Sequence, residues 1–259
     1  MKVELFLDKS VEENASVYFE KSKKLKKKIK GALEAVEVHK NKLKKLEKEK
    51  AREKEDYEKN KEVKLKKEWY EKFRWFFSSE NFLVIGGRDA TTNEIVIKKH
   101  TDKNDIVFHT DLAGSPFFVI KTENKKPGKA TLSEVADATV TFSRVFKLGQ
   151  SSSPVFHVSP EQVSKEAQTG EYLTKGAFMI RGKTNYIDNK INLAVGKLKD
   201  GRLMAAPLES INKHCKEFMI LQQGDKKTSE IAKKIKHKLN GNLDDIIRIL
   251  PAGGIDFKN

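Results

Sequence analysis

The chain has 259 residues, of which 37% are hydrophobic and 34% are charged. The length suffices for one large domain or for one domain with an extended appendage, and the low apolar and high charged content indicates that part of the chain is a solvated helix with little core of its own. Lysine and arginine number 52 against 37 acidic residues, and the net charge of +15 favours a polyanionic partner such as RNA, DNA or an acidic membrane surface. The alternative is a basic protein whose charge only keeps it soluble.

Cysteine content and apolar patterning narrow the cellular setting. The single cysteine, Cys215, excludes a disulfide framework and a cysteine-based zinc site within one chain, and it fits a reducing cytosol. No apolar run approaches the ~20 residues of a transmembrane helix, and the first ten residues lack a secretory signal. We therefore predict a cytoplasmic protein with no membrane partner.

Residues 1–78 are predicted to form a helical coiled-coil arm. Residues 12–78 contain no proline and one glycine, and they are rich in lysine and glutamate. Apolar residues recur at spacings of three, four and seven, as in a coiled-coil seam, at Leu25, Ile29, Ala32, Val36, Leu43 and Leu46. The pattern then fades and returns at Val63. It fits one long helix or an antiparallel hairpin that turns within residues 50–60, and the hairpin is preferred although no turn signal marks its tip.

A lysine-rich run lies near the start of this arm. Seven of the ten residues 21–30 are lysine. On a helix, such a run forms either a solvated face or a stripe that follows phosphates. On the second interpretation, Lys24, Lys27 and Lys28 are candidate RNA contacts.

Residues 79–259 are predicted to form an α/β domain. Strands are expected at 82–85, 94–99, 105–109, 117–121, 154–158, 178–181, 191–195, 202–206 and 218–221. A helix is expected from a capping box at Thr131–Glu134 to Gly149, another begins at Ser159, and two more cover 231–239 and 243–250. The predicted fold class is α+β, a mixed β-sheet with flanking helices, preceded by the long N-terminal helical arm.

Signatures of common enzymes are absent from the sequence. It has neither a Walker-type phosphate loop nor a Gly-x-Ser-x-Gly nucleophile elbow, and its six histidines do not pair at metal-ligand spacing. We therefore predict no catalytic residue, no metal and no cofactor. The best acid–base candidate is the group Asp105, His109 and Asp111, for which turn residues capping a strand are the simpler interpretation.

Several segments together resemble the NFACT family. Trp69–Phe76, Phe82–Ala90 and His109–Pro116 are similar to the first part of that family's NFACT-R domain. Further similar segments are Pro160–Lys165, Gly170–Leu173, Gly176–Lys183 and Asn185–Tyr186. Val11–Ser16 resembles the entry to the family's coiled-coil arm. The resemblance extends over essentially the whole chain, but Ala113 stands where the family often has histidine, which argues mildly against chemistry there.

The resemblance implies an RNA-binding module of ribosome-associated quality control. Family members bind large ribosomal subunits that carry a stalled nascent chain, and they position tRNA so that residues are added to that chain without mRNA. The implied partners are therefore the rRNA of the large subunit and tRNA. The family's NFACT-N half lies outside this sequence and is a further candidate partner.

Candidate RNA contacts in the second region are the basic residues Arg88, Lys98, Lys99, His109, Lys165, Arg181 and Lys183. Arg88 follows two glycines that are expected to allow positive φ in a tight turn. Its guanidinium can bind a phosphate or stack on a base, or instead pair with Asp89 or Glu94. Strand alternation would place Lys98 and Lys99 on opposite faces.

Two other hypotheses stay open. The first is an RNA-modifying or hydrolytic enzyme that uses His109, Asp111 and Arg88, which would require these three residues to share one pocket. The second is an adaptor whose coiled coil binds a protein partner through an exposed apolar seam. The fading heptads disfavour a long dimeric coiled coil.

Overall fold

The computed structural model of the chain describes residues 3–59, 67–166 and 173–258. The chain divides into two compact units, Met1–Lys66 and Lys67–Asn259. The predicted division fell after residue 78. The structure differs because residues 69–72 form a 3-10 helix, η1 (Trp69–Lys72), and residues 74–77 form the first strand of the second unit, which buries Trp75 and Phe76.

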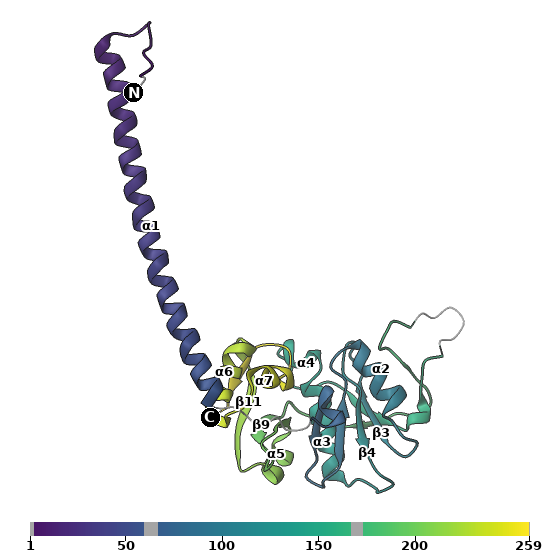
Figure 1. The fold of residues 1–259 in the computed structure, drawn as a ribbon. Coiled ribbons are helices and arrows are strands. Elements are labelled where there is room, and N and C mark those ends of the chain that lie inside the picture. Colours follow the sequence, from purple (N-terminus) through teal and green to yellow (C-terminus); the bar gives the residue numbers. More distant parts are fainter. Residues whose placement is uncertain (1–2, 60–66, 167–172, 259) are drawn as a thin grey trace. The chain divides into compact units, whose positions relative to one another are not determined.

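The first unit is built on one helix, α1 (Val11–Lys59) (Figure 1). Ser10 and Glu13 begin it with a capping box, in which Ser10 Oγ accepts from Glu13 N at 3.1 Å and the Glu13 carboxylate accepts from Ser10 N at 2.8 Å. The helix continues to Lys59 without a turn, so the predicted hairpin tip does not occur within residues 50–59, and Asn60 lies outside the described residues. The seam residues are 50–62% exposed: Leu25, Ile29, Val36, Leu43 and Leu46.

The second unit contains two larger sheets and one short hairpin. The six-stranded sheet has the order β1-β2-β4-β3-β5-β8, formed by β1 (Arg74–Phe77), β2 (Leu83–Gly86), β4 (Phe118–Lys121), β3 (Ile106–Thr110), β5 (Val155–Val158) and β8 (Asn185–Ile187). The four-stranded sheet has the order β10-β9-β11-β12, formed by β10 (Leu203–Ala206), β9 (Leu193–Lys197), β11 (Glu217–Lys226) and β12 (Ile255–Phe257). The hairpin joins β6 (Val163–Ser164) to β7 (Met179–Ile180).

The α+β class is confirmed, but the predicted mixed sheet is wrong in one respect. Every strand pair among the described residues is antiparallel. Three neighbouring pairs, β1–β2, β3–β4 and β9–β10, follow each other directly in the chain, and such short connections join antiparallel strands, whereas a parallel pair requires a long crossover.

Helices cover the sheets and complete the core. α3 (Lys129–Thr141) packs across β3, β4 and β5, and α2 (Ala90–Lys99) packs against β2. α5 (Leu208–His214) contacts β1 as well as β9 and β10, while α6 (Thr228–Leu239) and α7 (Leu243–Ile249) pack on the four-stranded sheet. The short elements α4 (Arg144–Lys147) and η2 (Pro160–Gln162) follow α3 and β5. Phe76, Phe108 and Phe118 are fully buried, and each contributes about 1.5–3 kcal/mol through burial.

The segment 94–99, predicted as a strand, belongs to helix α2. Its start is set by a capping box in which the Asp89 carboxylate accepts from Thr92 N at 2.8 Å and Thr92 Oγ1 accepts from Asp89 N at 2.9 Å. The alternating β-branched residues favour a strand. The helix start is hard to recognise in the sequence because aspartate with threonine is a less familiar form of the capping box. Because Lys98 and Lys99 belong to a helix, they do not alternate between the two faces of a sheet as predicted.

Helix α3 begins two residues before the predicted capping box, and a distant residue caps it. The Glu80 carboxylate accepts from Gly128 N at 3.0 Å and from Thr131 N at 3.2 Å, and Thr131 Oγ1 also donates to it. The helix stops at Thr141 instead of Gly149, since Ser143 starts α4 as an N-cap. The Glu80 carboxylate, from the turn between β1 and β2, thus caps the N-terminus of α3 in place of the predicted local capping box.

Candidate nucleic-acid interface

The motif residues meet at a cavity of about 340 Å³ beside the six-stranded sheet. Its walls come from the end of β2 and the start of α2, from the segment after β3, and from residues 174–178 before β7. Arg74, Arg88, His109, Phe142 and Phe178 are among the side chains that line it. Two of the predicted site residues, Arg88 and His109, therefore share one cavity.

Asn93 holds the walls of this cavity together. Its side chain is buried, its Oδ1 accepts from Phe117 N at 3.1 Å, and its Nδ2 donates to Ser115 O at 3.4 Å. These bonds tie the segment after β3 to helix α2, because one amide side chain satisfies a backbone donor and a backbone acceptor of that segment. Asn93 is therefore a positioning residue for the cavity.

Gly86 and Gly87 allow close approach to this site, but not through positive φ as predicted. Neither is among the residues with positive φ. A Cβ on Gly86 would overlap the Phe118 ring, and a Cβ on Gly87 would overlap the Asn93 side chain. Glycine is therefore required at both positions because the neighbouring side chains leave no space for a Cβ.

His109 lies half-buried on the aromatic side of the cavity. Its ring stacks on Phe117 with centroids 4.1 Å apart and an angle of 25° between the planes. Its Nε2 lies 3.2 Å from Ser115 O. Burial lowers the pKa of His109 below its ordinary value of 6.5, despite a hydrogen bond to Ser115 that acts in the opposite direction. The imidazole is therefore neutral at pH 7, and at that pH Nε2 donates to the Ser115 carbonyl as the protonated ring nitrogen.

Arg74 and Arg88 bring positive charge to the cavity. The Arg74 guanidinium lies 4.4 Å above the centre of the Phe142 ring, and its Nη1 is 3.4 Å from Leu250 O. Burial, and then the nearby charge of Arg88, lower the pKa of Arg74 to about 9. Burial, and then Arg248, also lower the pKa of Arg88, which donates to the backbone carbonyl of Arg248.

Neither guanidinium forms an ion pair with a carboxylate among the described residues. The predicted alternative for Arg88, a salt bridge to Asp89 or Glu94, is therefore not formed there. Asp89 instead caps helix α2, and Glu94 pairs with Lys98 at 2.7 Å. The cavity thus has an excess of positive charge.

Asp111 does not join Arg88 and His109 in the cavity. It is exposed, and its carboxylate accepts a hydrogen bond from the Tyr186 hydroxyl at 3.3 Å. Asp105 is buried at the start of β3, where it pairs with Lys121 and accepts from Thr122 N at 3.0 Å. Asp105 and Asp111 therefore lie outside the cavity, and the condition of the enzymatic hypothesis, that His109, Asp111 and Arg88 share one pocket, is not met.

The other predicted cations of this unit lie around the cavity or apart from it. Lys165 lies 3.5 Å from the Glu94 carboxylate, which also binds Lys98, and its Nζ is 5.2 Å from the centre of the Phe178 ring. Phe178 lines the cavity, so Lys165 contacts its wall. The exposed Arg181 donates to Glu166 O at 3.0 Å. Lys99 and Lys183 are exposed and do not line this cavity.

The arm candidates lie in the first unit. Lys24, Lys27 and Lys28 are exposed on α1. Residues 27 and 28 are adjacent in the helix and 24 lies one turn earlier, so the three cations share one side of it. This arrangement suits contact with a run of phosphates and equally suits solvation.

Arg74 lines the cavity but is not among the predicted site residues. It stands between the aromatic residues Phe73 and Trp75 at the start of β1. A charged residue inside an aromatic strand is the signal that could have marked it, because burying such a charge is costly unless it has a partner.

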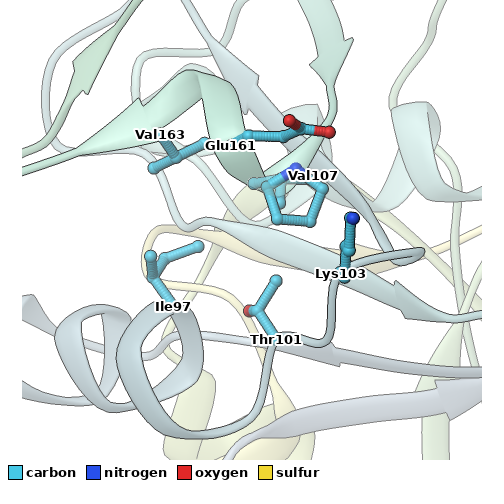
Figure 2. A pocket seen from close by; sticks show the side chains of 7 residues that line it. Ile97, Thr101, Lys103, Val107, Glu161 and Val163 are labelled. Atoms are coloured by element: carbon cyan, nitrogen blue, oxygen red, sulfur yellow. The ribbon is translucent and has the colours of Figure 1, made fainter.

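A second cavity of about 350 Å³ lies between the end of α2 and η2 (Figure 2). Figure 2 shows walls that are partly apolar and partly polar, with Ile97 and Val163 to one side and with Lys103 and Glu161 as the charged groups. It contains none of the predicted site residues. The described part of the chain also holds no group of three or more histidine, cysteine or acidic side chains suited to a metal, and no helix long and apolar enough to cross a membrane.

Comparison with known proteins identifies the class. Residues 72–182 match the family described as the NFACT protein RNA binding domain. The archaeal Rqc2 homolog aRqcH of Methanocaldococcus jannaschii is 43% identical over 198 residues, which cover 74% of this chain and 29% of that protein. The human ribosome quality control complex subunit NEMF is 46% identical over 122 residues, which cover 46% of this chain and 11% of NEMF.

The chain therefore carries an NFACT-R RNA-binding domain and is homologous to aRqcH and NEMF. It spans less than a third of the length of these curated relatives. Among solved structures, the C-terminal part of the fibronectin/fibrinogen-binding protein from Streptococcus suis aligns with 20% identity and a TM-score of 0.39, covering 71% of this chain and 78% of that one.

Proposed function

We propose that this chain is an RNA-binding module that docks on the large ribosomal subunit, on tRNA or on both, in the quality control of stalled nascent chains. The observation that carries the proposal is the cavity with Arg74, Arg88 and His109 inside an NFACT-R domain. Such a module acts in the cytoplasm and needs no cofactor. An NFACT-N half, on the same or another chain, is a proposed partner because the homologues are much longer.

Charge supports this proposal at two levels. The net charge of +15 attracts a polyanion over the whole chain. The lysines of α1 can supply sequence-independent phosphate contacts, whereas the cavity can select RNA groups by their shape. RNA offers both phosphates and unpaired bases, so it matches both features.

The test is co-sedimentation of the purified chain with large ribosomal subunits over a salt series, with tRNA binding measured in parallel. We expect the logarithm of the binding constant to fall linearly with the logarithm of the salt concentration. Replacing Lys24, Lys27 and Lys28 with glutamine should reduce the slope by about one for each phosphate contact that is lost.

The matched control replaces Lys42, Lys44 and Lys45, three lysines further along α1, with glutamine. It removes the same charge from the same helix, so equal slopes for the two variants would show that only total charge matters. Absence of sedimentation and of tRNA binding even at low salt would contradict the proposal for this chain.

The exposed seam of α1 favours one second candidate, the protein adaptor. Its apolar side chains are about half to two-thirds exposed in this chain, and such a surface is typical of an interaction site. Binding to the ribosome that is insensitive to salt but abolished by Ile29→Glu and Val36→Glu would favour the adaptor over RNA recognition.

A further inference from the structure

We propose that the cavity lined by Arg74, Arg88 and His109 holds a single unpaired nucleotide of RNA, with its phosphate on the two guanidiniums and its base against the aromatic wall. This inference deepens the RNA-binding function proposed above and rests on it. It names which part of the RNA the cavity takes and which side chains take it.

The two guanidiniums are half-buried without an ion pair in the part of the chain that the structure describes, and the carboxylate in the cavity lining is that of Asp89, which caps α2. The guanidinium of Arg74 has a backbone carbonyl at 3.4 Å and an aromatic face as its contacts, and Arg88 lies close enough to oppose its charge. Neither arginine has a carboxylate partner among the described residues. A half-buried cation without an ion pair is costly unless an anion completes the site. Two forked guanidiniums suit a phosphate.

The size and lining of the cavity also match a single nucleotide. Its volume of about 340 Å³ lies at the lower end of the ~300–1,000 Å³ range for small-ligand pockets. This size suits one nucleotide and excludes a paired helix. Phe117 and Phe178 line the wall in an edge-to-face pair, with centroids 5.4 Å apart. Aromatic walls receive bases that have left their stack.

The walls of the cavity are held in place by contacts within the folded chain. Asn93 ties Ser115 and Phe117 to α2. On the other side, Gly176 has a φ of +80° and lies directly against the Ala90 backbone, where a Cβ would clash. Rigid walls lower the conformational cost of binding, so even one nucleotide can bind measurably without the rest of an RNA.

The experiment is an amide chemical-shift titration of the full chain with adenosine 5′-monophosphate, adenosine and inorganic phosphate. We expect the monophosphate to shift the amides of Arg88, Gly114 and Ala177 in a saturable way. Adenosine and inorganic phosphate should each bind at least about tenfold more weakly, because each lacks one half of the contacts. Uridine 5′-monophosphate tests whether the wall prefers a larger base.

Two variants test the guanidiniums. Arg88→Ala should weaken binding of the monophosphate about tenfold or more, and Arg74→Met should do the same while keeping the bulk of the side chain. The control is Lys199→Ala, which removes an exposed cation that is not part of the cavity and should leave the affinity unchanged. Melting temperatures of all variants check that each one folds.

Three results would overturn the inference. The monophosphate could fail to shift these amides, inorganic phosphate could bind as tightly as the nucleotide and so define an anion site only, or Arg88→Ala could bind the nucleotide like the parent chain. Parallel binding of tRNA separates this failure from that of the proposed function. If tRNA binds the parent chain and Arg88→Ala equally while the nucleotide does not bind, the pocket assignment fails and the RNA-binding function stands.

Discussion

The arm and the cavity carry positive charge in opposite ways. On α1 the lysines are exposed, and their helix depends on local backbone hydrogen bonds and a capping box. At the cavity, Arg74 is half-buried against the Phe142 ring, and its pKa is lowered by burial. An exposed charge costs little free energy on folding, and its effect on binding depends on how many such charges there are. A charge that is removed from water costs more free energy on folding, and its effect on binding depends on where it lies.

The largest expected difference between the two regions comes from a methyl group added to a glycine. Gly86→Ala brings a Cβ into the Phe118 ring, and such overpacking should reduce the free energy of unfolding by about 1–3 kcal/mol. Gly31→Ala on α1 meets no atom within 4 Å and should stabilise the helix by about 0.5–1 kcal/mol. Chemical denaturation of both variants measures this, and equal effects would contradict the contrast.

Arg74→Met sharpens the comparison through stability and pH. Because the pKa of Arg74 falls from 12.5 to about 9 on folding, the unfolded chain binds the proton more tightly between these values, so its contribution to stability increases as pH rises through that window. At pH 7 the half-buried cation opposes folding. We therefore expect Arg74→Met to unfold at an equal or higher denaturant concentration, with a free energy of unfolding up to about 1 kcal/mol larger than that of the parent chain. The same variant should lose nucleotide binding.

A loss of stability in Arg74→Met comparable to that of Gly86→Ala would show that the guanidinium serves the fold. The matched control is Arg181→Met, which removes an exposed arginine and should change the free energy of unfolding by no more than about 0.5 kcal/mol.

Protonation of His109 at low pH should have a smaller effect on the free energy of unfolding. Its pKa in the folded chain is lowered by burial from 6.5, so the unfolded chain takes up the proton first as the pH falls. Its contribution to stability is fully present above pH 6.5 and decreases as the pH falls below that value. Denaturation at pH 7.5 and 5.5 should show a smaller loss in His109→Gln than in the parent chain. His100 and His157, whose burial acts in the same direction, contribute equally to both.

The smallest expected effect on folding belongs to the arm lysines. Replacing Lys24, Lys27 and Lys28 with glutamine removes exposed charge from a helix without removing a buried contact, so the denaturation midpoint should not move measurably. The same variant should still reduce the salt slope of RNA binding. A clear drop in stability would mean that these lysines have a structural role that the exposed helix does not suggest.

Local chemistry made much of the fold predictable. Strands such as 105–109 and 117–121 and the helix at 231–239 could be predicted because apolar periodicity records which face each element buries. The helix at 90–99 could not, since its β-branched residues favour a strand and only the contact between Asp89 and Thr92 selects a helix start. The start of α3 was missed because its cap, Glu80, is remote in sequence.

The sequence by itself determined the basic character, the α+β class, the helical arm and the NFACT resemblance, because composition, periodicity and motifs are local properties of the chain. It also selected Arg88 and His109 for the site. Only the tertiary structure brought these two residues into one cavity with Arg74 and left Asp111 outside it. The reason is that burial and ion pairing depend on which distant segments of the chain lie side by side. In this protein the antiparallel strand pairing and the hydrogen bonds of Asn93 to Ser115 and Phe117 set which segments form the cavity.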